Sequence, residues 1–190
     1  MIERFRQARA MREMWGSITI NTRHDRSFEE LVAAGNYAHV DKDISPEHFP
    51  FPKSDNDAEE QIVFFRFDHR RFSQIFKRVV TFKEIIGRIH RDKARGYLPI
   101  GIEELLTIGE KFTNLSPLVA LAAVWKYSIP NVIVTSSGKR INALIMVDAF
   151  PCIFEADGGR YLGLRRFFAP PEAQKWETDW RFGAIDNLGR

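Results

Sequence analysis

Apolar positions recur with a helical period in two neighbouring segments of the chain. Phe82, Ile85 and Ile89 are spaced three and four residues apart, which is typical of one face of an amphipathic helix. A capping-box pattern begins at Thr81, just before this face, and Gly96 lies beyond its end. The pattern therefore predicts a helix that begins after Thr81 and ends before Gly96.

A second helical pattern lies between Pro99 and Thr113. Its apolar stripe consists of Ile102, Leu105, Leu106, Gly109 and Phe112. Glu103 and Glu104 fall in its first turn, where negative charge stabilises a helix. A glycine within a helix costs about 1 kcal/mol relative to alanine. We therefore expect another residue to pack closely against Gly109.

Shorter runs of β-branched and aromatic residues predict strands on either side of these helices. The runs cover residues 61–67, 118–125, 131–135, 141–147 and 180–185. The run at 118–125 is almost wholly apolar, which indicates a strand buried on both faces, although a buried helical turn has the same pattern. Hairpin-type turns are predicted at residues 136–139 and 157–159.

The part of the chain before residue 61 has fewer regular signals. The pattern over residues 2–15 predicts a charged helix. A capping box at Ser27 and Glu30 predicts a second, short helix that ends at Gly35. Prolines 46, 50 and 52 then exclude a long helix or a central strand.

Composition sets limits on the class of protein. The 190 residues are 44% apolar and include sixteen Phe, which is enough for a substantial core. No apolar run is long enough to span a membrane, and the first residues are charged, unlike a secretion signal. A single cysteine, Cys152, excludes an internal disulfide and a cysteine-rich zinc site. We therefore expect a cytoplasmic protein that does not bind a membrane.

Charge is distributed unevenly along the chain. Residues 27–65 carry nine acidic and two basic side chains, whereas residues 66–95 carry ten basic and three acidic ones. The two segments neutralise each other if they pack together. If they do not, the second segment presents a basic face to nucleic acid or to another acidic partner. The candidate cations of this face are Arg66, Arg70, Arg71, Lys77, Arg78, Arg88, Arg91 and Arg95.

Few residues suggest catalytic or metal chemistry. One loop groups His39, Asp41, Asp43, Glu47 and His48, but without the ligand spacing of a known metal site. Residues 136–139 lack the glycine frame of a phosphate-binding loop. The sequence also lacks a nucleophile motif. We therefore expect no catalytic site, metal or other cofactor, while a site assembled from distant residues remains open.

Four motifs resemble those of a group of bacterial proteins of uncharacterised function. They are Gly96-Tyr97-Leu98-Pro99, Glu103-Glu104-Leu105-Leu106, Pro117 to Trp125, and Trp180 to Ile185. The resemblance covers most of residues 27–186 and implies no activity. More remotely, the order of the motifs is similar to the C-type-lectin-like fold, including the branch of the formylglycine-generating enzymes.

The lectin-like resemblance implies an α+β fold in which two helices accompany a mostly antiparallel sheet of short strands. This domain is expected over residues 61–190, after a helical and proline-rich N-terminal extension over residues 1–60. Ile129-Pro130-Asn131 lacks the calcium ligands of lectins, and the catalytic cysteine pair is absent. We therefore interpret the chain as a non-catalytic module that binds a protein partner. Nucleic-acid binding through the basic segment 66–95 is the alternative.

Overall fold

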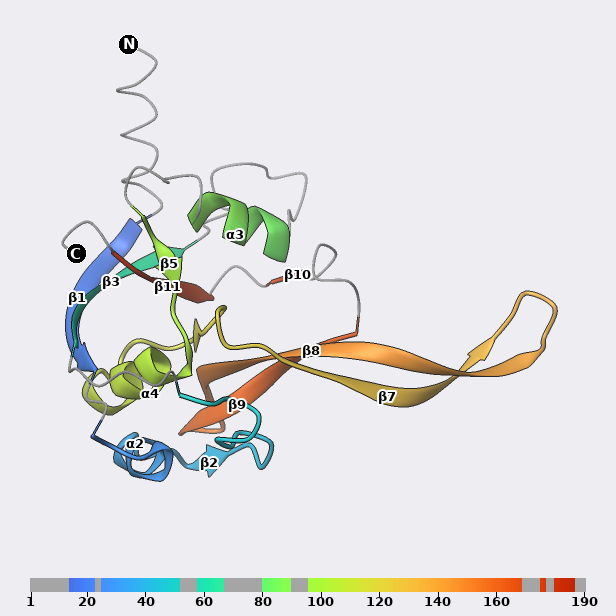
Figure 1. Ribbon diagram of the computed structural model, residues 1–190, viewed down its shortest axis with the longest axis horizontal. Helices are drawn as coiled ribbons and strands as arrows, with labels where there is room; N and C mark the ends of the chain where they lie inside the picture. Colours follow the sequence, from blue (N-terminus) through green and yellow to red (C-terminus); the bar gives the residue numbers. More distant parts are fainter. Residues whose placement is uncertain are drawn as a thin grey trace, which may run out of the picture.

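A nine-stranded mixed sheet organises the protein (Figure 1). The computed structural model describes residues 14–22, 25–51, 58–66, 80–89, 96–168, 175–176 and 180–186. The strands of the sheet are β1 (Met14–Thr22), β2 (His39–Val40), β3 (Ala58–Arg66), β5 (Leu98–Pro99), β6 (Leu118–Val119), β7 (Trp125–Val134), β8 (Arg140–Ala156), β9 (Gly159–Phe167) and β11 (Arg181–Ile185). Their order is β1-β3-β11-β6-β8-β9-β2, with β5 paired to β11 and β7 paired to β8.

Three helices are described, together with a second, two-stranded sheet. The helices are α2 (Phe28–Ala34), α3 (Phe82–Ile89) and α4 (Ile102–Lys111). The small sheet consists of β4 (Val80–Thr81) and β10 (Lys175–Trp176). In the large sheet β11 runs parallel to β6, and β2 runs parallel to β9, while the other pairs are antiparallel.

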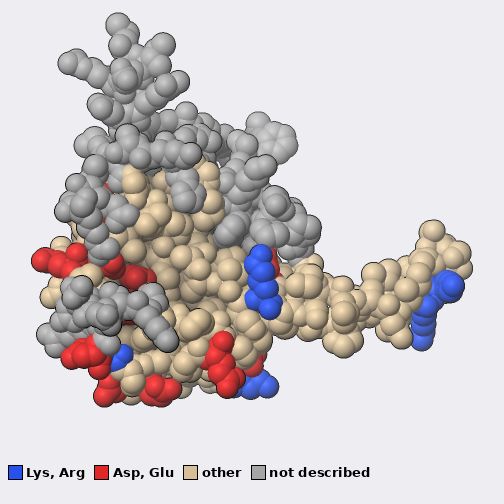
Figure 2. Space-filling view, in the orientation of Figure 1, with Lys and Arg blue, Asp and Glu red and all other residues tan. Residues whose placement is uncertain are grey.

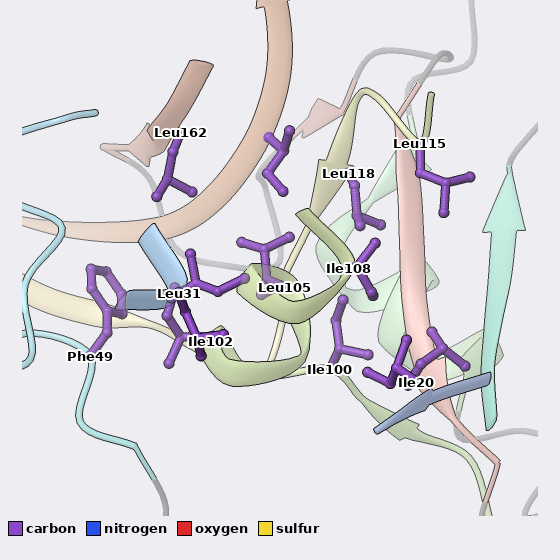
Figure 3. Packing of buried hydrophobic residues seen from close by; sticks show 14 of the residues in the cluster. Ile20, Leu31, Phe49, Ile100, Ile102, Leu105, Ile108, Leu115, Leu118 and Leu162 are labelled. Atoms are coloured by element: carbon purple, nitrogen blue, oxygen red, sulfur yellow. The ribbon is translucent and has the colours of Figure 1, made fainter. Parts of the chain in front are cut away.

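Alternation along β3 assigns the two faces of the sheet to different helices. Successive side chains of a strand point to opposite faces. Ile62 and Phe64 join the cluster that contains α2 and α4, whereas Val63 and Phe65 join the cluster that contains α3. All four residues are buried, so β3 is a central strand covered on both sides. Figure 3 shows the first cluster, in which α4 packs against side chains from the sheet and from α2.

Gly109 in α4 provides the close approach that the sequence predicts. A Cβ at this position would overlap the Tyr37 hydroxyl and lie 2.9 Å from Cδ1 of Ile153. The Arg160 guanidinium lies 5.1 Å from the centroid of the Tyr37 ring and donates hydrogen bonds to the carbonyls of Gly35, Gly109 and Phe112. These carbonyls lie at or near the C-terminal ends of α2 and α4, where backbone acceptors lack helical partners. Arg160 therefore joins both helix ends to β9.

The expected C-type-lectin-like arrangement is wrong. The structure is dominated by one mixed sheet that includes β1 from the N-terminal part of the chain, and its strands β7 to β9 are long. The two helices expected at 82–95 and 102–112 form as α3 and α4, but they cover opposite faces of the sheet instead of accompanying a sheet of short strands. Sheet order depends on pairing between distant segments, which local patterns do not encode.

Other local predictions have mixed outcomes. The helix expected over residues 2–15 is wrong at its end, since Met14 and Trp15 begin β1, and residues 1–13 lie outside the described part of the chain. The short helix after Ser27 is confirmed with its capping box, as are the strands at β3 and β11 and the turn after Ala156. The division of the chain at residue 60 stays a prediction.

Candidate functional site

A two-stranded ribbon projects from the sheet and is the most distinctive surface feature of the protein (Figure 1). β7 and β8 pair from Trp125 with Ala149 out to Val134 with Arg140. On its other side, β8 pairs with β9 only from Asp148 onward. Residues 126–147 therefore have no third strand beside them in the described structure, and we call this segment the arm.

The tip of the arm is a polar turn. The Thr135 amide donates to the Lys139 carbonyl at 2.9 Å, and the Gly138 amide donates to the Thr135 carbonyl at 2.8 Å. Gly138 has a φ of 80°, a left-handed conformation that glycine adopts without strain. This turn confirms the hairpin prediction at residues 136–139.

Apolar side chains are exposed along the arm. Nine large apolar residues of the described chain are exposed, and six of them lie on the arm: Val132, Ile133, Val134, Ile141, Leu144 and Met146. Leu144 and Met146 are 70% and 60% exposed. Monomeric proteins rarely expose contiguous apolar surface of this kind unless it binds something.

Both faces of the arm carry large apolar side chains. Residues that oppose each other in an antiparallel pair share a face. One face carries the pairs Ile129–Ile145 and Ile133–Ile141, and the other carries Pro130–Leu144 and Ser128–Met146. A strand with one solvated face normally alternates apolar and polar residues. The arm does not alternate in this way, so its composition is that of strands covered on both sides.

The two edges of the arm differ. Pro130 lies in the middle of β7 and has no N–H to offer to another strand, which is a common device for protecting an edge strand. The outer edge of β8 over residues 140–147 contains no proline. The β8 edge is therefore the better template for pairing with an added strand.

Stacked rings hold the base of the arm. The His48 ring stacks on Trp125 at 3.8 Å between centroids, and Trp125 stacks on Tyr127 at 4.2 Å. His48 is itself positioned by a 2.8 Å contact between its Nδ1 and the carbonyl of Asp43. The loop that precedes β3 thus supports the first residues of β7.

An ion-pair cluster lies beside these rings. Arg166 in β9 donates to Asp41 at 2.9 and 3.2 Å and to Asp43 at 2.9 Å. Burial raises the pKa of Asp41, but the hydrogen bonds from Arg166 and from the Asp43 amide outweigh it, so the pKa lies below its usual value. Hydrogen bonding to Asp41 raises the pKa of Arg166, and Tyr127 contributes in the same direction. The cluster therefore links β9 and the loop that contains Asp41 and Asp43 to the first residues of β7.

The arm and the body of the protein differ in charge. Residues 126–147 contain three cations, Lys126, Lys139 and Arg140, and no acidic residue. Figure 2 shows acidic side chains gathered on the body and cations at the far end of the arm. An acid-bearing protein surface therefore complements the tip.

The cations expected to form a basic face cannot be placed together. Arg66 and Arg88 lie in β3 and α3, but their side chains lie outside the described part, as do all of Arg70, Arg71, Lys77, Arg78, Arg91 and Arg95. Nucleic-acid binding by this segment, and its neutralisation by residues 27–65, both stay predictions.

The loop residues considered as metal ligands, and the single cysteine, contact other parts of the protein. Asp41 and Asp43 bind Arg166, and the His39 ring packs 5.7 Å from that of Tyr161. In the described ranges, no three His, Cys, Asp or Glu side chains are grouped so that they could hold a metal ion. Burial raises the pKa of Cys152 to about 12, so its thiol stays protonated and unreactive.

No protein-family model, curated protein or solved structure matches the chain. The resemblance to the bacterial group therefore stays a prediction. Across the helices that the structure describes, none has the length and apolar character needed to cross a membrane.

Sequence reasoning found the strands of the arm but missed their role. The pattern predicts the strands and the turn of a hairpin but not its position, and in the structure residues 126–147 extend away from the helices (Figure 1). The available signal was the loss of alternation at Leu144 and Met146, which occupy positions that a half-exposed strand usually gives to polar residues.

Proposed function

We propose that this protein is a non-catalytic binding module that docks on another protein through the arm. The observation that supports this most directly is the exposure of Leu144, Met146 and Val132 on a projecting ribbon whose two faces both carry large apolar side chains. Two strands alone bury too little surface to be stable in water, whereas three or more strands, or a packed face, provide that stability. A partner that covers the arm supplies the buried surface that two strands alone do not provide.

The chemistry of the arm favours a protein partner over a membrane. Insertion of the tip into a bilayer would bury Lys139 and Arg140 together with the hydroxyl groups of the turn. Three cations over 22 residues also give weak attraction to the phosphates of nucleic acid. Apolar faces and an open strand edge are instead the features that bind proteins by strand addition. A cytoplasmic location belongs to this proposal.

Site-specific photo-crosslinking in the native cells tests the proposal. A photoreactive amino acid replaces Leu144 on the arm, and in a matched control it replaces Lys111, which is exposed at the end of α4. We expect a discrete adduct with a protein from the arm position and none from the control. Equal labelling from both positions, or no adduct from the arm, contradicts the proposal.

A further inference from the structure

We propose that the partner of the arm is a second copy of this chain, paired through the open edge of β8 over residues 140–147. This inference rests on the proposed function of the arm and names its occupant. Two arms then form a continuous four-stranded sheet around a two-fold axis, with β7 of each copy on the outside. Two-fold dimers are the commonest assemblies of identical chains.

The hydrogen-bonding pattern shows which backbone groups of β8 face the open edge. Hydrogen-bonded and non-hydrogen-bonded pairs alternate along an antiparallel ladder. Thr135 and Lys139 are hydrogen-bonded, so the pairs Ile133–Ile141 and Asn131–Ala143 are hydrogen-bonded as well. The intervening pairs, which include Pro130–Leu144, are not. This agrees with the missing N–H of Pro130.

It follows that alternate residues of β8 direct their backbone groups outward. Asn142, Leu144 and Met146 point their N–H and C=O groups away from β7 and toward the open edge. Antiparallel pairing of this segment with its own copy near Leu144 provides about six backbone hydrogen bonds. These groups are bonded to water in a lone arm.

The side chains of the segment are complementary to themselves. In antiparallel pairing around an axis near Leu144, Ile141, Ala143 and Ile145 extend one apolar row, whereas Leu144 and Met146 share the other face with Asn142. The segment has a single charged residue, Arg140, at one end. Two-fold symmetry places the two Arg140 side chains at opposite ends of the paired region, so like charges do not meet.

Charge at the base of the arm is balanced. Asp43 is paired with Arg166, and Lys126 Nζ lies 3.9 Å from Oδ1 of Asp148. The strand edges and the apolar rows therefore provide the affinity between the two arms. The paired edges form a small interface, for which we expect a dissociation constant on the order of micromolar.

A pair of proline substitutions tests the edge directly. In Leu144→Pro the lost N–H is one that faces the open edge, so the β7–β8 ladder keeps its hydrogen bonds. In the matched control Val132→Pro the lost N–H faces the outer edge of β7, as at Pro130. Sedimentation equilibrium of the purified full chain is expected to show a dimer that L144P weakens at least about tenfold and V132P weakens less than about twofold.

Three results would overturn the proposal. The first is a wild-type chain that stays monomeric up to about 200 μM, a concentration well above a micromolar dissociation constant. The second is a dimer that L144P leaves intact. The third is an equal weakening of the dimer by L144P and V132P. If L144P does not fold, Leu144→Cys replaces it. Oxidation should then give a covalent dimer from L144C and little from V132C, because only the former lies near the axis; equal yields contradict the proposal.

The same experiments separate this inference from the proposed function. A monomeric purified chain whose arm crosslinks a different protein in cells refutes the second copy and leaves the binding role of the arm intact. Absence of both the dimer and any adduct at residue 144 refutes both. An adduct whose mass is twice that of the chain, together with the L144P effect, supports both.

Discussion

The helix α4 and the arm are built from the same apolar residue types, yet their surroundings are opposite. Seven of the ten residues of α4 are buried, and its Leu and Ile side chains contact β-strands and α2 (Figure 3). In the arm, six large apolar side chains are exposed. The comparison shows that the apolar content of a segment indicates how much of its surface must be buried, but not by which molecule. For α4 the same chain supplies the cover, and for the arm we propose that another molecule does.

The two regions also differ in how they are held. α4 is fixed by packing over its whole length and by Arg160 at its C-terminal end. The arm is fixed only at its base, by the ring stack on Trp125 and by the cluster around Arg166. Substitutions at α4 should therefore change the stability of the fold, whereas substitutions along the arm should change binding.

The largest expected contrast comes from the same substitution in both regions. Leu105→Ala in α4 should lower the free energy of unfolding by about 3 kcal/mol, because it leaves a cavity in a fully buried site. Leu144→Ala should change it by less than about 0.5 kcal/mol when measured at a concentration at which the chain is monomeric. Urea unfolding followed by circular dichroism provides both values. Similar losses for the two variants would mean that the arm belongs to the core.

Removal of the helix-end anchor should have the next largest effect. Arg160→Met leaves the carbonyls of Gly35, Gly109 and Phe112 without this donor, and we expect a loss of about 2–3 kcal/mol. Lys111→Met, at an exposed position on the same end of α4, is the control and should be close to neutral. Thermal unfolding of both variants measures the difference. A loss in the control that equals the loss in R160M would refute a specific role of the guanidinium.

A smaller, pH-dependent effect is expected at the base of the arm. Because the folded-state pKa of Asp41 is below its usual value of 3.8, its ion pair stabilises the fold above that pH and is lost as the pH falls through the folded-state value. Asp41→Asn should therefore cost about 1 kcal/mol at pH 7, a modest value for a partly exposed pair. The deficit should shrink at acidic pH. A deficit that is independent of pH, measured by urea unfolding at several pH values, would contradict this assignment.

The smallest effect is expected at Tyr37. Burial raises the pKa of its hydroxyl to about 12, and within the described structure this buried hydroxyl has no hydrogen-bond partner. Tyr37→Phe should therefore change stability by less than about 0.5 kcal/mol, in the stabilising direction. In a Gly109→Ala background the same change should recover stability, because it removes the atom that the new Cβ meets. A loss above about 1 kcal/mol in Y37F alone would show that the hydroxyl is bonded.

Elements whose ends are fixed by neighbouring residues could be predicted from the sequence. The Ser27 hydroxyl accepts from the Glu30 amide at 3.1 Å, and Glu30 in turn accepts from the Ser27 amide at 2.8 Å, as its capping box predicts. Glu104 accepts from the Gly101 amide at 2.7 Å at the start of α4. In the turn at Asp157 and Gly158, both residues have positive φ, which these residue types tolerate. Each feature depends on contacts within a few residues.

Features that depend on distant partners could not be predicted in this way. The run at 118–125, expected to be one buried strand, is buried only to Leu121; Ala122 is exposed and β7 begins at Trp125. Pro130 lies within β7, because an edge strand accommodates a proline whose N–H would face outward. The arm is exposed because β9 ends opposite Asp148. No local pattern in β8 predicts that end.

The position of β11 in the sheet has a consequence for protein synthesis. β11 follows every other described strand in the chain, yet it lies between β3 on one side and β5 and β6 on the other. A nascent chain that stops short of residue 181 therefore has two separate half-sheets, each with an open edge where β11 will insert. Such edges are prone to pairing with other chains. The ribosome must finish this segment before the halves can join, so truncated products should be substrates for chaperones.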